Sequence, residues 1–177
     1  MRQPNVQKVD LPTKTLAALA FPRIDYADAY RMRLPDGAPN DIDAVAHAAL
    51  GTAPRWVTLL MRLRDWLVGM IGLKTSRQTA WRNLGHNRLQ AGDRLGVFKV
   101  FDRCADELLL GEDDRHLDFR LSVLISSDGS ASWVVVSTVV RFNSWLGRAY
   151  FLPVQPLHKL IVPAMLRNAY QRNSHKQ

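Results

Sequence analysis

The chain has 177 residues, of which 47% are hydrophobic and 23% charged, the size and composition of one globular domain. The single cysteine, Cys104, excludes an intramolecular disulfide and favours a reducing compartment. The net charge is +8, but the basic residues are scattered, which argues against a nucleic-acid-binding surface. The polar start and the charges within the apolar stretches predict a cytoplasmic protein without a membrane span.

The N-terminal part of the chain is predicted to contain an arm, a strand and two helices. Residues 1–14 show no pattern and are expected to form a flexible arm, and residues 15–20 fit either a strand or a helical turn. Alternation of apolar and charged residues from 26 to 34 predicts a strand. Apolar spacing predicts one helix from Asn40, its N-cap, to Leu50, and a second over residues 52–72.

The middle of the chain is dominated by a predicted β-hairpin. Residues 74–93 have no sustained period and are expected to be a long connection, followed by strands over 96–103 and 107–110. Strict alternation then begins at residue 115, and Asp128-Gly129 between two such runs is typical of a two-residue turn. This turn predicts that Ser127 faces Ser130, His116 faces Arg141 and Asp118 faces Val139.

The two faces of this hairpin differ in character. The odd-numbered residues from Leu117 to Ile125 are apolar and are predicted to pack on the rest of the protein. The other face mixes charges with Trp133 and valines, which suggests a covered or oligomeric surface.

A long C-terminal helix is predicted after Ser144, which can cap it. Its apolar stripe needs the apolar face of the hairpin as a partner, while His158 and Lys159 are expected elsewhere on its surface. Pro153, Pro156 and Pro163 predict that the helix is kinked or broken. The expected fold is therefore α+β, with a curved antiparallel sheet wrapped on this helix and two shorter helices near the N-terminus. Residues 15–173 are predicted to form this single domain.

Several segments carry a family resemblance. They are Leu109-Leu110-Gly111-Glu112-Asp113-Asp114-Arg115-His116-Leu117-Asp118-Phe119-Arg120, Thr138-Val139-Val140-Arg141, Leu146-Gly147-Arg148-Ala149-Tyr150-Phe151-Leu152-Pro153 and His158-Lys159-Leu160-Ile161-Val162-Pro163. The chain resembles the bacterial family known as domain of unknown function 2867, which implies a START-like, or polyketide-cyclase-like, helix-grip fold. The family supplies no catalytic residues. Some relatives follow a dinucleotide-binding, sugar-epimerase-like domain, but this chain has no Gly-x-Gly-x-x-Gly segment, so any redox partner would be a separate polypeptide.

Four side chains on the mixed face form a candidate catalytic set: His116, Asp118, Arg120 and Arg141. An imidazole oriented by a carboxylate suits general acid–base chemistry, and a guanidinium can hold a carboxylate or enolate. This set would suit a cyclase, dehydratase or isomerase. The alternative is that these residues form cross-strand ion pairs on a solvated face.

The leading hypothesis is a protein that binds a small apolar or amphipathic ligand between the sheet and the C-terminal helix. The residues expected to line this cavity are Leu117, Phe119, Leu121, Val136, Val140, Tyr150, Leu160 and Met165. No cofactor is expected, and no metal site, because the five histidines lie far apart in the sequence. A third hypothesis is a non-catalytic partner subunit of a separate oxidoreductase or epimerase, or a homodimer, with the Trp133 face as the contact.

Overall fold

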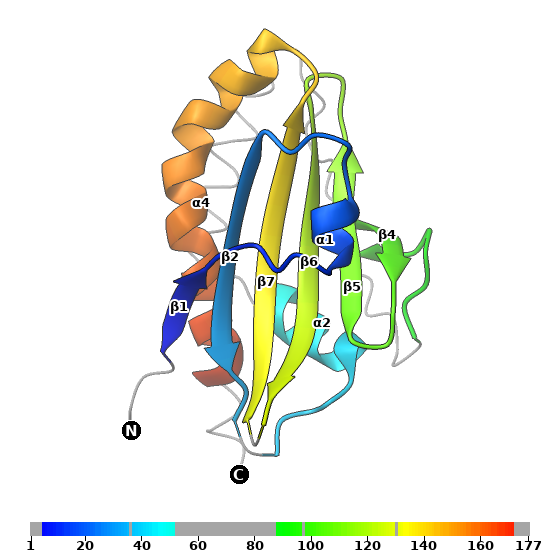
Figure 1. Ribbon diagram of the computed structural model, residues 1–177, viewed down its shortest axis with the longest axis vertical. Coiled ribbons are helices and arrows are strands. Elements are labelled where there is room, and N and C mark those ends of the chain that lie inside the picture. The colour runs from blue at the N-terminus through cyan, green and yellow to red at the C-terminus, as the bar shows by residue number, and fades with distance from the viewer. Residues whose placement is uncertain (1–4, 36, 52–87, 97, 130, 172–177) are drawn as a thin grey trace.

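The computed structural model describes residues 5–35, 37–51, 88–96, 98–129 and 131–171. These residues form an antiparallel open sheet of seven strands in the order β1-β2-β7-β6-β5-β4-β3, with helices on both faces (Figure 1). The predicted α+β architecture, a curved antiparallel sheet with a long C-terminal helix, is confirmed. The predicted helix over residues 52–72 and most of the predicted connection over 74–93 lie outside the described residues. Within the described part of the chain, no helix has the length and apolarity needed to cross a membrane.

The elements have the following bounds. The strands are β1 (Val6–Val9), β2 (Tyr26–Arg33), β3 (Arg94–Leu95), β4 (Phe98–Arg103), β5 (Glu107–Asp113), β6 (Leu117–Asp128) and β7 (Ala131–Phe142). The helices are α1 (Leu16–Leu19), α2 (Ile42–Gly51) and α4 (Trp145–Gln171).

Three segments differ in detail from the sequence predictions. Val6–Val9, inside the expected arm, pairs with β2 as the edge strand β1. The N-cap of α2 is Asp41, whose Oδ2 accepts a 3.0 Å hydrogen bond from the N–H of Ala44, so the prediction of Asn40 was wrong. Helix α4 runs unbroken from Trp145 to Gln171 although it contains three prolines.

The hairpin register differs from the prediction by two residues. Asp128 pairs with Ala131, so Asp118 faces Arg141 and His116 does not. The predicted pairing was wrong because Gly129, with φ of 60°, allows a turn one position later than the Asp128-Gly129 turn assumed from the sequence. Side chains alternate along a strand with a period of two, so this shift leaves each side chain on its predicted face.

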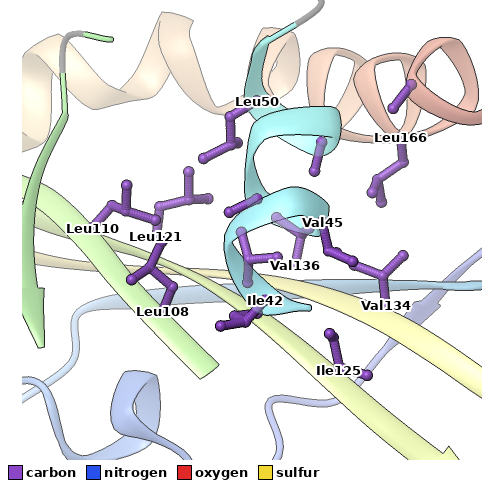
Figure 2. Close-up of a cluster of buried hydrophobic side chains, with 14 of the residues drawn as sticks. Ile42, Val45, Leu50, Leu108, Leu110, Leu121, Ile125, Val134, Val136 and Leu166 are labelled. Carbon is purple, nitrogen blue, oxygen red and sulfur yellow. The ribbon is translucent and has the colours of Figure 1, made fainter. Parts of the chain in front are cut away.

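The inner face of the sheet, defined here as the face that packs against α2 and α4, carries the larger core (Figure 2). Figure 2 shows Ile42, Val45, Leu50, Leu108, Leu110, Leu121, Ile125, Val134, Val136 and Leu166 in this cluster. Full burial of one such side chain contributes about 1.5–3 kcal/mol. The prediction that the odd-numbered residues of β6 face the C-terminal helix, α4, is therefore confirmed for Leu121, Val123 and Ile125.

The opposite, outer face is covered in part by the N-terminal segment and α1, which cross the sheet on the near side in Figure 1. A second core of Ala17, Phe21, Leu109 and Val139 forms beneath them. This packing explains Val139 on the mixed face. Trp133, near one end of this face, is half-buried, and the guanidinium of Arg31 lies 4.7 Å from the centre of its ring.

Candidate functional site

The outer polar cluster, defined as Asp113, Asp118, Arg120 and Arg141, contains three of the four predicted catalytic residues. Nη2 of Arg141 lies 2.6 Å from Oδ2 of Asp118, and Nη1 of Arg120 lies 2.8 Å from Oδ1 of Asp113. Asp118 is 4% and Arg120 8% exposed, so the expectation of a solvated face was wrong for these two residues.

Aromatic rings enclose the arginines of this cluster. The guanidinium carbon of Arg120 lies 3.4 Å from the ring centre of Phe101 and 4.9 Å from that of Phe21. The same Phe21 ring lies 5.2 Å from the guanidinium of Arg141. Such cation–π contacts stabilise a desolvated guanidinium. Through these contacts the outer polar cluster joins Phe21 of the N-terminal segment and Phe101 of β4 to Arg120 on β6 and Arg141 on β7.

His116, the fourth predicted catalytic residue, is not brought to the carboxylate of Asp118. Its Nδ1 lies 3.1 Å from Oγ of Ser144, and its carbonyl oxygen accepts hydrogen bonds from the N–H groups of Asn143 and Ser144. Ser144 also caps α4 as predicted, because its Oγ accepts a hydrogen bond from the N–H of Gly147. His116 thus ties the beginning of β6 to the beginning of α4.

A shallow hollow of about 250 Å³ lies at this corner, lined by Phe142, Asn143, Ser144, Trp145 and Arg148. Asp25 is beside it: the N–H of Phe142 donates to its Oδ2 at 2.8 Å, and Arg148 lies 3.8 Å from its Oδ1. The hydrogen bond from Phe142, followed by the contact with Arg23, lowers the pKa of Asp25 despite the opposing effect of burial. The hollow lies where β7 meets α4 and not over the centre of the inner face.

A second group of polar side chains, which the sequence analysis did not identify, lies on the inner face beneath α4. We call Tyr26, Asp28, Thr138 and His158 the inner polar cluster. Nε2 of His158 lies 3.3 Å from Oδ1 of Asp28 and 3.1 Å from Oγ1 of Thr138, and the hydroxyl of Tyr26 donates to Oδ2 of Asp28 at 2.6 Å. The side chain of Asp28 is only 1% exposed, whereas that of His158 is 20% exposed.

The pKa of Tyr26 is raised, first by burial and then by its hydrogen bond to Asp28. The phenol therefore stays protonated and remains a donor to the carboxylate. Both oxygens of Asp28 are thus engaged, one by the phenol and one by the imidazole. The side chain of Gln155, one helical turn before His158, has a smaller and opposite effect on the pKa of Tyr26.

Sheet pairing explains how these residues meet. Asp28 on β2 pairs directly with Thr138 on β7, and α4 runs along this side of the sheet (Figure 1). His158 shares the sheet-facing side of α4 with buried Phe151 and Val162, so the expectation that it lies on the helix surface was wrong. One sequence signal was available: Asp28 falls on the same side of β2 as Tyr30 and Met32, where an acidic residue needs a buried partner.

The residues predicted to line a cavity take three different environments. Leu121, Val136 and Val140 are buried, whereas Leu117, Phe119, Tyr150 and Met165 are half-buried. Leu160 is 63% exposed. The half-buried Phe119 ring meets that of Phe98 on β4 edge to face, with 5.9 Å between ring centres.

Comparison with known proteins gives a family. No curated protein and no solved structure matches the chain. A family model with the description "Protein of unknown function (DUF2867)" matches residues 20–165, a range that includes both polar clusters. The chain therefore belongs to the DUF2867 family, as its sequence resemblance predicted.

Proposed function

We propose that the protein binds a small amphipathic molecule against the inner face of the sheet, beneath α4. The polar part of this molecule would lie at the inner polar cluster and the apolar part against the half-buried side chains of β6 and β4. The observation that carries the proposal is the presence of a buried carboxylate and a histidine beside apolar side chains that the described core does not fully cover.

Sheet register places the polar and apolar halves side by side. Asp28, Thr138 and Leu121 form one row across β2, β7 and β6, and Tyr26, Val140 and Phe119 form the next row. Each row is therefore polar or phenolic at β2 and apolar at β6. An amphipathic molecule lying across the strands would match this gradient, because specific sites combine apolar walls with a few polar groups.

The architecture also supports the proposal. An antiparallel sheet that packs against a long C-terminal helix is the arrangement expected of the START-like helix-grip class, whose ligands lie between sheet and helix. Toward the other end of the inner face, side chains of α2 fill this space (Figure 2). The proposed site is therefore limited to the end of the sheet near Tyr26 and Phe119.

Fluorescence titration with anilinonaphthalene sulfonate, together with native mass spectrometry of gently purified protein, tests the proposal. The substitution Phe119→Trp adds volume at the apolar half, and we expect it to weaken dye binding about tenfold, or about 1.4 kcal/mol. The matched control is Leu19→Trp on α1, where the native side chain is 78% exposed and the dye affinity should not change.

Two results would contradict the proposal. One is a wild-type protein that is recovered empty and binds no dye. The other is dye binding that Phe119→Trp leaves unchanged in a variant whose thermal unfolding midpoint matches the wild type. Leu117→Phe, which adds volume at the next inner-face position of β6, provides a second variant should Phe119→Trp fail to fold.

A further inference from the structure

We infer that Nδ1 of His158 accepts a hydrogen bond from a weakly acidic hydroxyl group, a phenol or an enol, on the bound molecule. The inference rests on the proposed ligand site and specifies the chemistry of its polar end. Three features carry the inference: the contact between Nε2 of His158 and Asp28, the partial exposure of the His158 side chain, and the burial of the Asp28 carboxylate.

The hydrogen bonds of His158 define its tautomer. Nε2 lies 3.3 Å from Oδ1 of Asp28, and a carboxylate accepts hydrogen bonds without donating them. We therefore assign the hydrogen of the imidazole to Nε2, which leaves Nδ1 as its acceptor, and the hydroxyl of Thr138, 3.1 Å from Nε2, can accept the same hydrogen. Nδ1 forms no hydrogen bond with any residue that the structure describes.

Exposure indicates where a ligand can reach the imidazole. The Nε2 end of the ring is inserted between Asp28 and Thr138, and the carboxylate of Asp28 is 1% exposed. The side chain of His158 is nevertheless 20% exposed. Part of the side chain thus remains accessible while Nε2 is held between Asp28 and Thr138.

The buried carboxylate selects the type of group that can bind. A carboxylate on one nitrogen of an imidazole stabilises positive charge on the ring, which makes the other nitrogen a better acceptor. An ionised carboxylic acid would bring a second negative charge near Asp28 and is therefore disfavoured. An ether or a ketone has no hydrogen to donate. A phenol or enol donates a hydrogen bond while it stays neutral, and its apolar skeleton can extend from Tyr26 toward the half-buried Phe119 in the same row.

The experiment compares naphthol with its methyl ether as probes of nearly equal size and apolar surface. Wild-type protein should bind naphthol about tenfold more tightly, as expected for a hydrogen bond to a charge-supported acceptor. The discriminating variant is His158→Gln, because its amide nitrogen can still donate to Asp28, whereas its only acceptor, the amide oxygen, is bonded to the same carbon and does not occupy the place of Nδ1 across the ring. In this variant the affinity for naphthol should fall to that for the ether, while the affinity for the ether stays the same.

The outcomes separate the inference from the proposed function. Equal affinities in the wild type, or a preference for naphthol that survives in His158→Gln, overturn the inference and leave ligand binding in place. Failure of both probes and of anilinonaphthalene sulfonate to bind overturns both. Nitrogen-15 NMR of wild-type protein gives a test that needs no variant: we expect a protonated Nε2 and a Nδ1 resonance that shifts when naphthol is added. A protonated Nδ1 in the free protein would overturn the inference.

Discussion

The backbone N–H of Leu16, at the start of α1, donates a 2.8 Å hydrogen bond to the carboxylate of Glu107 on β5. The same carboxylate accepts a hydrogen bond from the N–H of Ala17 and one from the hydroxyl of Ser122. Glu107 is 3% exposed. A side chain of the sheet therefore satisfies the free N–H groups of a one-turn helix and fixes it on the outer face.

We predict that Glu107→Ala lowers the free energy of unfolding by about 2–3 kcal/mol, because it leaves buried donors without an acceptor. Urea denaturation followed by tryptophan fluorescence measures this loss. The control is Glu112→Ala on the same strand, where the native side chain is 48% exposed and forms a surface ion pair with Arg94. Its loss should stay below about 1 kcal/mol. Equal losses in the two variants would contradict the role assigned to Glu107.

Gly147 is predicted to tolerate no side chain. A Cβ atom at this position would lie 2.1 Å from the carbonyl oxygen of His116, and backbone cannot move aside as a flexible side chain can. We expect Gly147→Ala to destabilise the fold by about 2 kcal/mol or more, although alanine is the better helix former. The control, Ala149→Ser at an exposed position of the same helix, should change stability by less than about 1 kcal/mol. A neutral Gly147→Ala would show that α4 can shift away from β6.

The ion pairs of the outer polar cluster are predicted to contribute unequally. Asp118 has a side chain 6% exposed and Asp113 one 57% exposed. We expect Asp118→Asn to cost about 1–2 kcal/mol, reduced by the partial exposure of Arg141, and Asp113→Asn to cost less than about 1 kcal/mol. A double-mutant cycle of Asp118→Asn with Arg141→Gln measures the pair directly. Coupling near zero would mean that the 2.6 Å contact contributes no stability.

Tyr26 on β2 and Tyr170 on α4 predict a loss of stability at high pH. The pKa of Tyr26 is raised, and burial raises the pKa of Tyr170 to about 12. A raised folded-state pKa means that the unfolded state loses its proton first, near the ordinary value of 10.0. The stabilisation is therefore complete below that pH and is lost progressively above it.

Chemical denaturation at a series of pH values from about 8 to 11 measures this effect. Tyr26→Phe and Tyr170→Phe should each make stability decline less steeply above the ordinary tyrosine pKa than it does in the wild type. Their absolute stability can change for other reasons, so the slope with pH is the quantity to compare. An unchanged slope in both variants would contradict the prediction.

The strands and α4 could be predicted because their signals are local. Alternation of apolar and polar residues along β6 defined its two faces whatever its partner. The register could not be predicted in the same way, because both Asp128-Gly129 and the turn one position later fit the local sequence. The edge strand Val6–Val9 carries only four residues and gains its order from pairing with β2.

The inner polar cluster could not be predicted because it joins positions far apart in the chain. Asp28 and His158 are separated by 130 residues, and their contact depends on which turn of α4 crosses β2. The predicted catalytic set around His116 was weak for a different reason, because it was chosen from residues that are close together in the sequence. A register shift of two residues was enough to move His116 away from Arg141.

The position of β2 beside β7 has a consequence for folding. The β6–β7 hairpin can form early from neighbouring residues, whereas β2 must close a loop of more than one hundred residues to reach its place, since Tyr26 pairs with Val140. Until β2 pairs with it, β7 is an unprotected edge strand with valines on both of its faces. Such strands tend to pair with other chains. The N-terminal strands therefore protect the nascent sheet from aggregation, and a chain shortened to remove residues 1–33 should self-associate in light scattering where the full chain does not.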